Sequence, residues 1–115
     1  MATAVLFIGW NRPHNHENPE KAFGWLVAEG APFFKKQEGK YFERSELVGL
    51  TAHGGDLNGC IVLFGERAKL DEFRRTDEFE GFVMNLSRHF DRVGVIPGLN
   101  WDGIQNLMKR RNIKA

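Results

Sequence analysis

The sequence is poor in the residues that build disulfide or zinc scaffolds. Its 115 residues include one cysteine, Cys60, so no disulfide can form within the chain and a zinc site built on several cysteines is excluded. Cys60 begins the apolar stretch CIVLF, which is typical of a buried free thiol in a reducing compartment. We therefore expect a cytoplasmic protein.

Neither sign of charge is in excess, and long apolar runs are missing. The chain has 16 Lys and Arg against 15 Asp and Glu, a formal net charge of +1. This balance provides no overall attraction to nucleic acid or to an anionic membrane. No stretch has the length of a membrane span, and the N-terminal MATAVLFIGW lacks the basic start and cleavage site of a signal peptide. We expect no nucleic-acid partner and no membrane partner.

Motifs of several familiar enzyme classes are missing as well. There is no G-x-S-x-G nucleophile motif, and GGDLNG (54–59) lacks the lysine and the strand-to-helix context of a phosphate loop. A catalytic pair of carboxylates is not apparent either. We expect no bound cofactor and no metal site.

Short apolar runs indicate four strands. Residues 4–10 (AVLFIGW) are apolar throughout and rich in Val, Ile, Phe and Trp, which favours a strand buried on both faces. Residues 47–53 and 60–64 flank GGDLNG, whose glycines and Asn/Asp are typical of a chain reversal, so we expect a hairpin. Residues 91–98 predict a fourth strand, in which Pro97 is best tolerated at an edge or an end.

Helical spacing fills the remaining segments. Asn18 is suited to cap a helix that starts at Pro19, with an interruption at Gly30 and Pro32 and an end at Gly39. Residues 68–90 predict a second helical region with a break near Thr76. One face of that region is apolar, through Phe79, Phe82, Val83, Leu86 and Phe90. A terminal helix follows the cap residue Asn100.

The order strand, helix, strand, strand, helix, strand predicts an α+β, ferredoxin-like βαββαβ domain covering residues 1–115. Its helices should cover one face of a four-stranded antiparallel sheet, with the terminal helix as an extension. The runs at 4–10 and 60–64 carry apolar residues on both faces, so the other face also needs cover. We expect a second copy to provide it, which makes a homodimer.

This order, with an apolar open face and a C-terminal extension, resembles the dimeric α/β-barrel superfamily, in which two such sheets pack into a barrel. The superfamily includes cofactor-independent oxygenases, isomerases, stress-induced proteins and many uncharacterised members. The resemblance implies a pocket between sheet and helices. Some of its oxygenases use an Asn, a Trp and a Tyr around an aromatic substrate, and Asn11, Trp25 and Tyr41 are residues of the same types here.

All four histidines lie on connections that the topology brings to one end of the sheet. These connections are NRPHNHENPE, HGGDLNG and SRHFDR, and they contain the candidate catalytic residues His14, His16, His53 and His89. Imidazole titrates near neutral pH, which suits proton transfer. The same connections carry the charged residues Arg12, Asp56, Asp91 and Arg92, which would assist. The structural alternative is a set of unrelated polar loops.

Aromatic and amide side chains next to this end are candidates for ligand contacts. They are Trp10, Asn11, Phe23 and Phe82. Three functions stay open at this point. One is a small cofactor-independent enzyme, of oxygenase or isomerase type, acting on a small hydrophobic or aromatic molecule. Another is a non-catalytic ligand-binding or stress-response dimer, and the third is a dimer whose role is structural or regulatory.

Overall fold

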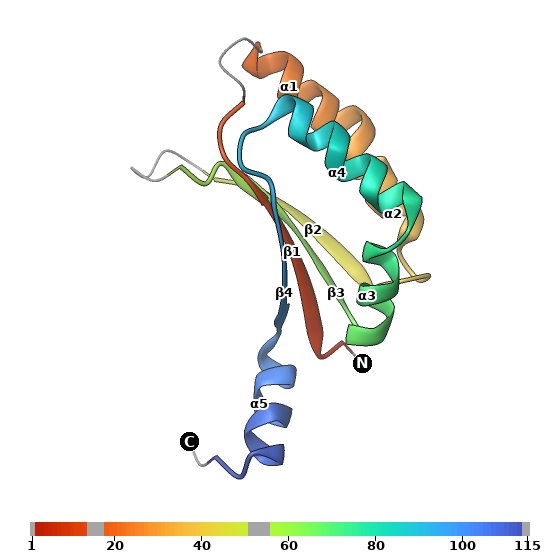
Figure 1. Ribbon diagram of the computed structural model, residues 1–115, viewed down its shortest axis with the longest axis vertical. Coiled ribbons are helices and arrows are strands. Elements are labelled where there is room, and N and C mark those ends of the chain that lie inside the picture. Colours follow the sequence, from red (N-terminus) through yellow and green to blue (C-terminus); the bar gives the residue numbers. More distant parts are fainter. Residues whose placement is uncertain (1, 14–17, 51–55, 114–115) are drawn as a thin grey trace.

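A computed structural model describes residues 2–13, 18–50 and 56–113. Four strands form an antiparallel sheet in the order β2-β3-β1-β4 (Figure 1). Their bounds are β1 Ala4–Trp10, β2 Arg44–Gly49, β3 Gly59–Gly65 and β4 Gly94–Leu99. The predicted α+β class and ferredoxin-like order are confirmed.

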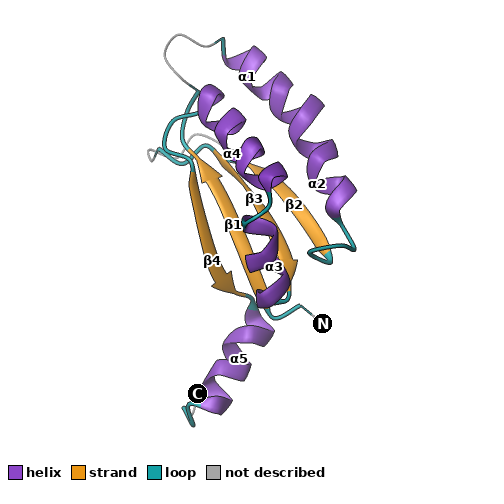
Figure 2. Ribbon diagram, turned by 45° about the vertical axis from the view of Figure 1, so that its right-hand side comes forward, coloured by secondary structure: helices purple, strands orange, loops and turns teal. Residues whose placement is uncertain are grey.

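The helices lie on one face of this sheet, except the last. The first helical stretch comprises α1 (Pro19–Trp25), the π-helical turn η1 (Leu26–Gly30) and α2 (Ala31–Gln37), and it runs beside α4 (Asp77–His89) (Figure 2). The short helix α3 (Arg67–Arg74) precedes α4, and α5 (Trp101–Arg110) projects beyond the end of the sheet. The helical region is interrupted at Thr76, between α3 and α4, as predicted. The Thr76 hydroxyl accepts a hydrogen bond from the Phe79 amide at 3.1 Å.

The core lies between the sheet and the helices. Side chains alternate along a strand, so Leu6 and Ile8 of β1 point to the same face, and both are fully buried there. Phe73 is the centre of the aromatic packing opposite them. Its ring lies within 6.4 Å, centroid to centroid, of five others, those of Phe33, Phe34, Tyr41, Phe42 and Phe79.

The predicted interruption near Gly30 and Pro32 takes the form of a π-helical turn, so the α-helix stops at Trp25 and resumes at Ala31 while the chain stays helical between them. The Ala31 amide donates to the Leu26 carbonyl, five residues back. Pro32, which has no amide hydrogen to donate, then stands in the first turn of α2, where no intrahelical donor is required. Gly30 faces α4, since a Cβ there would lie 3.6 Å from the Phe82 ring, an ordinary contact distance, and 3.1 Å from the Leu26 side chain.

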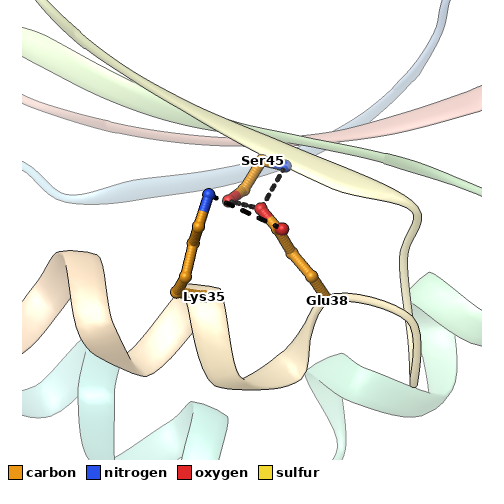
Figure 3. A network of polar contacts seen from close by, with 3 residues as sticks. All are labelled: Lys35, Glu38 and Ser45. Atoms are coloured by element: carbon orange, nitrogen blue, oxygen red, sulfur yellow. Dashed lines mark hydrogen bonds and ion pairs between the residues drawn. The ribbon is translucent and has the colours of Figure 1, made fainter.

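The predicted bounds of β2 are wrong at its start, and residues 51–53 of that prediction lie outside the described residues. The strand begins at Arg44, where polar residues are tolerated because β2 is an edge strand that alternates its faces. Glu38, which directly follows α2, binds the first residues of β2 through hydrogen bonds to Ser45. Its Oε1 accepts hydrogen bonds from the Ser45 amide (3.2 Å) and hydroxyl (2.9 Å), while Oε2 lies 3.9 Å from Lys35 Nζ (Figure 3).

The face of the sheet that no helix covers is apolar at its centre. Two pairs of partner residues on β1 and β3 have both side chains on this face. They are Val5 with Phe64, and Phe7 with Val62. Ile96 of β4, opposite Phe7, is 57% exposed. The Phe7 ring folds over Gly9, where a Cβ would lie 2.5 Å from it, so only glycine fits there without a shift. Pro97 lies on the edge strand β4, as predicted.

Glu38→Ala should weaken the attachment of β2. The substitution leaves the part-buried Ser45 hydroxyl and amide without their acceptor, so we expect a loss of about 1–2 kcal/mol in the free energy of unfolding. Glu38→Gln keeps an acceptor oxygen and should lose less than half of that. Urea unfolding followed by circular dichroism measures both variants. Equal losses in the two would show that the charge, and not the hydrogen bonds, matters.

Candidate functional site

Three connections meet at one end of the sheet, as the topology predicts (Figure 1). Backbone hydrogen bonds tie two of them together: the Asn11 amide donates to the Asp91 carbonyl (2.8 Å), and the Asp91 amide donates to the Arg12 carbonyl (3.0 Å). The third connection joins through the Asn58 amide, which donates to the Trp10 carbonyl at 2.8 Å. The end of the sheet is therefore a fixed backbone frame.

A small polar pocket lies in this frame. Its volume is about 100 Å³ and its lining residues come from all three connections: Asn11, Arg12, Asp56, Asp91 and Arg92. The formal charges of the two guanidinium groups and two carboxylates cancel. Arg92 has a positive φ of 50°, a left-handed conformation that is uncommon for residues other than glycine.

An aromatic wall follows from the residues next to the pocket residues in the chain, since Trp10 and Phe90 directly precede Asn11 and Asp91. Their ring centroids lie 5.6 Å apart, and Phe23 packs edge-on against Phe90 at 5.5 Å. Trp10 is 1% exposed. Among the described residues, its indole Nε1 is the one buried side-chain nitrogen or oxygen without a hydrogen-bond partner. A buried N–H without an acceptor is costly, so this donor is suited to a ligand.

Only one of the four candidate histidines lies in the described part of the chain. His14, His16 and His53 fall at positions outside it, although all three are in the connections that form the pocket. His89 ends α4, and its ring stacks on Trp25 with 4.7 Å between centroids. It therefore lies between the helices and is not among the residues that line the polar pocket.

A second hollow, the interhelical groove, lies between α4 and the helical stretch α1–η1–α2. Its volume is about 490 Å³, and its aromatic lining consists of Trp25, Phe33 and Phe82. The Phe33 and Phe82 rings stack in parallel at 4.9 Å, and Trp25 stacks on Phe82 at 5.6 Å. Sequence reasoning missed Trp25 and Phe33 as groove residues. Their spacing of eight residues places them on one helical face, but the predicted interruption at Gly30 separated them.

The structure divides the predicted ligand contacts between these two hollows. Asn11 lines the polar pocket, while Trp10 and Phe23 belong to the aromatic wall. Phe82 lies apart, in the interhelical groove. The trio Asn11, Trp25 and Tyr41 is also separated, since Tyr41 stacks on Phe73 in the core.

Two further findings concern the described residues alone. Among them, no group of three or more His, Cys, Asp and Glu side chains is arranged to hold a metal ion. None of the described helices is both long enough and apolar enough to cross a membrane.

Comparison with known proteins gives structural relatives only. No model of a protein family matches the sequence, and no curated protein does. Among solved structures, a dimeric ferredoxin-like protein of unknown function from Thermobifida fusca has a TM-score of 0.68 and 6% identity, covering 87% of this chain and 93% of its own. A DABB-family protein with a ferredoxin-like fold from Mesorhizobium loti has a TM-score of 0.65 and 8% identity, covering 85% and 97%.

A third relative has a described activity. SnoaB from Streptomyces nogalater, a cofactor-independent oxygenase, has a TM-score of 0.51 and 21% identity, covering 86% of this chain and 92% of its own. At these identities the likeness concerns the fold. The chain therefore has a ferredoxin-like fold.

Proposed function

We propose that this protein is a cytoplasmic homodimer in which the uncovered sheet faces of two copies pack together as a barrel. Support comes from the apolar centre of that face, where Val5, Phe7, Val62 and Phe64 lie side by side. A sheet face of this kind is unfavourable in water unless a second surface covers it. The Thermobifida fusca relative is itself described as dimeric.

The thiol of Cys60 fits this placement. Cys60 belongs to the same face, opposite Val48 of β2, and it is buried as a free cysteine. Burial, and to a smaller extent the carboxylate of Glu46, raises the pKa of this thiol above its usual value. The thiol therefore stays protonated at neutral pH and behaves as a small apolar side chain.

Phe7→Arg should dissociate the dimer. Phe7 pairs with Val62 and Ile96, so the substitution places a cation with no carboxylate in register at the centre of the apolar face, and we expect the dissociation constant to rise at least about 100-fold. Val27→Arg is the matched control, because Val27 is 65% exposed on the helical side of the molecule. Sedimentation velocity over a dilution series compares the two, with circular dichroism as the test of folding. A wild-type chain that is monomeric throughout would contradict the proposed dimer.

We further propose that the end of the sheet holds a small, partly aromatic molecule and acts on it without a bound cofactor. The observation that carries this proposal is the buried, unpartnered indole N–H of Trp10, the residue directly before Asn11 of the polar pocket to which three connections contribute. The ring of such a molecule would stack against Trp10, Phe23 and Phe90. Its polar substituent would accept the indole hydrogen bond and face Arg12 and Arg92.

The chemistry of this proposal is proton transfer. His14, His16 and His53 belong to the connections around the pocket, and imidazole can take or release a proton near neutral pH. The two arginines would stabilise negative charge as it develops on an enolate or phenolate oxygen. Cofactor-independent oxygenation starts from such an anion, and SnoaB, described as a cofactor-independent oxygenase, shares the fold.

Trp10→Phe should weaken binding of an aromatic probe while keeping an aromatic ring in the wall. Removal of one hydrogen bond in a desolvated site should raise the dissociation constant about tenfold. The probe is 1-naphthol, titrated against tag-free protein and followed by isothermal calorimetry. Trp25→Phe is the matched control, because Trp25 lies in the interhelical groove.

Three results of this titration are distinguishable. A loss of 1-naphthol affinity in Trp10→Phe alone supports binding at the end of the sheet. A loss of affinity in Trp25→Phe alone places the ligand in the interhelical groove. Equal affinity of the two variants contradicts the role of the Trp10 indole. Native mass spectrometry of the purified protein identifies any bound molecule for a turnover assay. Among the single alanine variants of His14, His16, His53 and His89, at least one should then abolish turnover. Four active variants, with binding intact, would favour a non-catalytic binding protein.

A further inference from the structure

The terminal helix α5 turns an apolar stripe away from its own chain. The stripe consists of Trp101, Ile104 and Met108, which are spaced three and four residues apart and therefore share one helical face. Trp101 is 68% exposed and Ile104 is 40% exposed. Side chains of this size are rarely left in water together on one helix without a partner.

The attachment of α5 to its own chain uses a different face. Gly103 is the buried residue of this helix, and a Cβ at that position would collide with the Thr3 carbonyl oxygen. At 3.6 residues per turn, Gly103 lies about 200° around the helix from Trp101. Asn100 completes the attachment, since its Nδ2 donates to the Ala2 carbonyl at 2.8 Å and its Oδ1 accepts from the Gly103 amide at 2.9 Å.

This attachment holds the start of α5 and leaves the rest projecting beyond the sheet, away from the other helices (Figures 1 and 2). A ten-residue helix is only marginally stable in water without packing partners. The helix therefore needs a surface that its own chain does not supply along the stripe.

The uncovered sheet face is small for an interface of standard size. Strands of six or seven residues are about 20 Å long, and four strands at about 4.8 Å spacing project onto a plane of about 400 Å², which is a lower bound on their accessible surface. A standard stable interface buries about 800 Å² of accessible surface on each partner, so apolar surface beyond the sheet would add to its stability. The helix α5 supplies such surface, because it directly follows β4, whose Ile96 belongs to the uncovered face.

We propose that α5 of each copy packs its stripe of Trp101, Ile104 and Met108 against the other copy, so that two helices clasp the dimer. This inference rests on the proposed dimer. Two-fold symmetry makes the contact reciprocal: the α5 helix of each copy packs on the other copy. The dimer therefore contains this contact twice, and both contacts add to its buried area. The occupant of the stripe is thus a second copy of this chain.

Paired substitutions on opposite faces of α5 test the clasp. Ile104→Asp places a carboxylate in the stripe, and we expect the dimer dissociation constant to rise at least tenfold. Asn106→Asp adds the same charge to an exposed position outside the stripe and should change it less than twofold. Sedimentation velocity over a dilution series measures both. Equal effects of the two substitutions, with the dimer intact, would overturn the clasp while leaving the sheet-to-sheet dimer in place.

A second measurement uses the wild-type chain and so does not depend on how the variants fold. Equal amounts of ¹³C-labelled and unlabelled protein are unfolded together, refolded and examined by an isotope-filtered NOE experiment. The clasp predicts contacts between the Trp101 ring of one copy and methyl groups of the other. A dimer in which Trp101 shows no such contacts would overturn the clasp alone. A monomer at every concentration would overturn the clasp together with the proposed dimer.

Discussion

The apolar character of the central strands on both faces is the constraint on which the rest of this structure depends. Leu6, Ile8 and Leu63 point into the helical layer, while Phe7, Val62 and Phe64 point the other way. The helices of one chain can cover only one of these faces, because both crossovers place them on the same side of the sheet. The second face therefore stays uncovered in the monomer, and the proposed dimer would cover it.

Because of the same constraint, the charged residues of the candidate site lie apart from the apolar core. Strand interiors are filled with apolar side chains, so charged groups collect where the chain leaves the sheet. Arg12, Asp56, Asp91 and Arg92 gather in this way, on a frame of backbone hydrogen bonds between two of the connections. Trp10 stands at the boundary of the two regions: its ring belongs to the core, its indole N–H has no partner, and it directly precedes the pocket residue Asn11 in the chain.

The errors made from sequence have local physical causes. The helix was expected to be interrupted at Gly30 and Pro32 and then to resume, but the chain stays helical there through the π-helical turn η1, in which the Ala31 amide donates to the Leu26 carbonyl. The start of β2 was missed because Arg44, Ser45 and Glu46 do not look like a strand. Their strand conformation depends on pairing with Phe64, Leu63 and Val62, and on the hydrogen bonds from Ser45 to Glu38.

The sequence alone determined the element order, the caps at Asn18 and Asn100, the break near Thr76 and the apolar open face, because local propensities and short-range periodicity carry that information. It also determined that three connections share one end of the sheet, which follows from antiparallel topology. Only the tertiary structure placed His89 against Trp25, left the Trp10 indole without an acceptor and turned the α5 stripe outward. Those features depend on which side chains meet across elements far apart in the chain, and periodicity along one element does not encode such contacts.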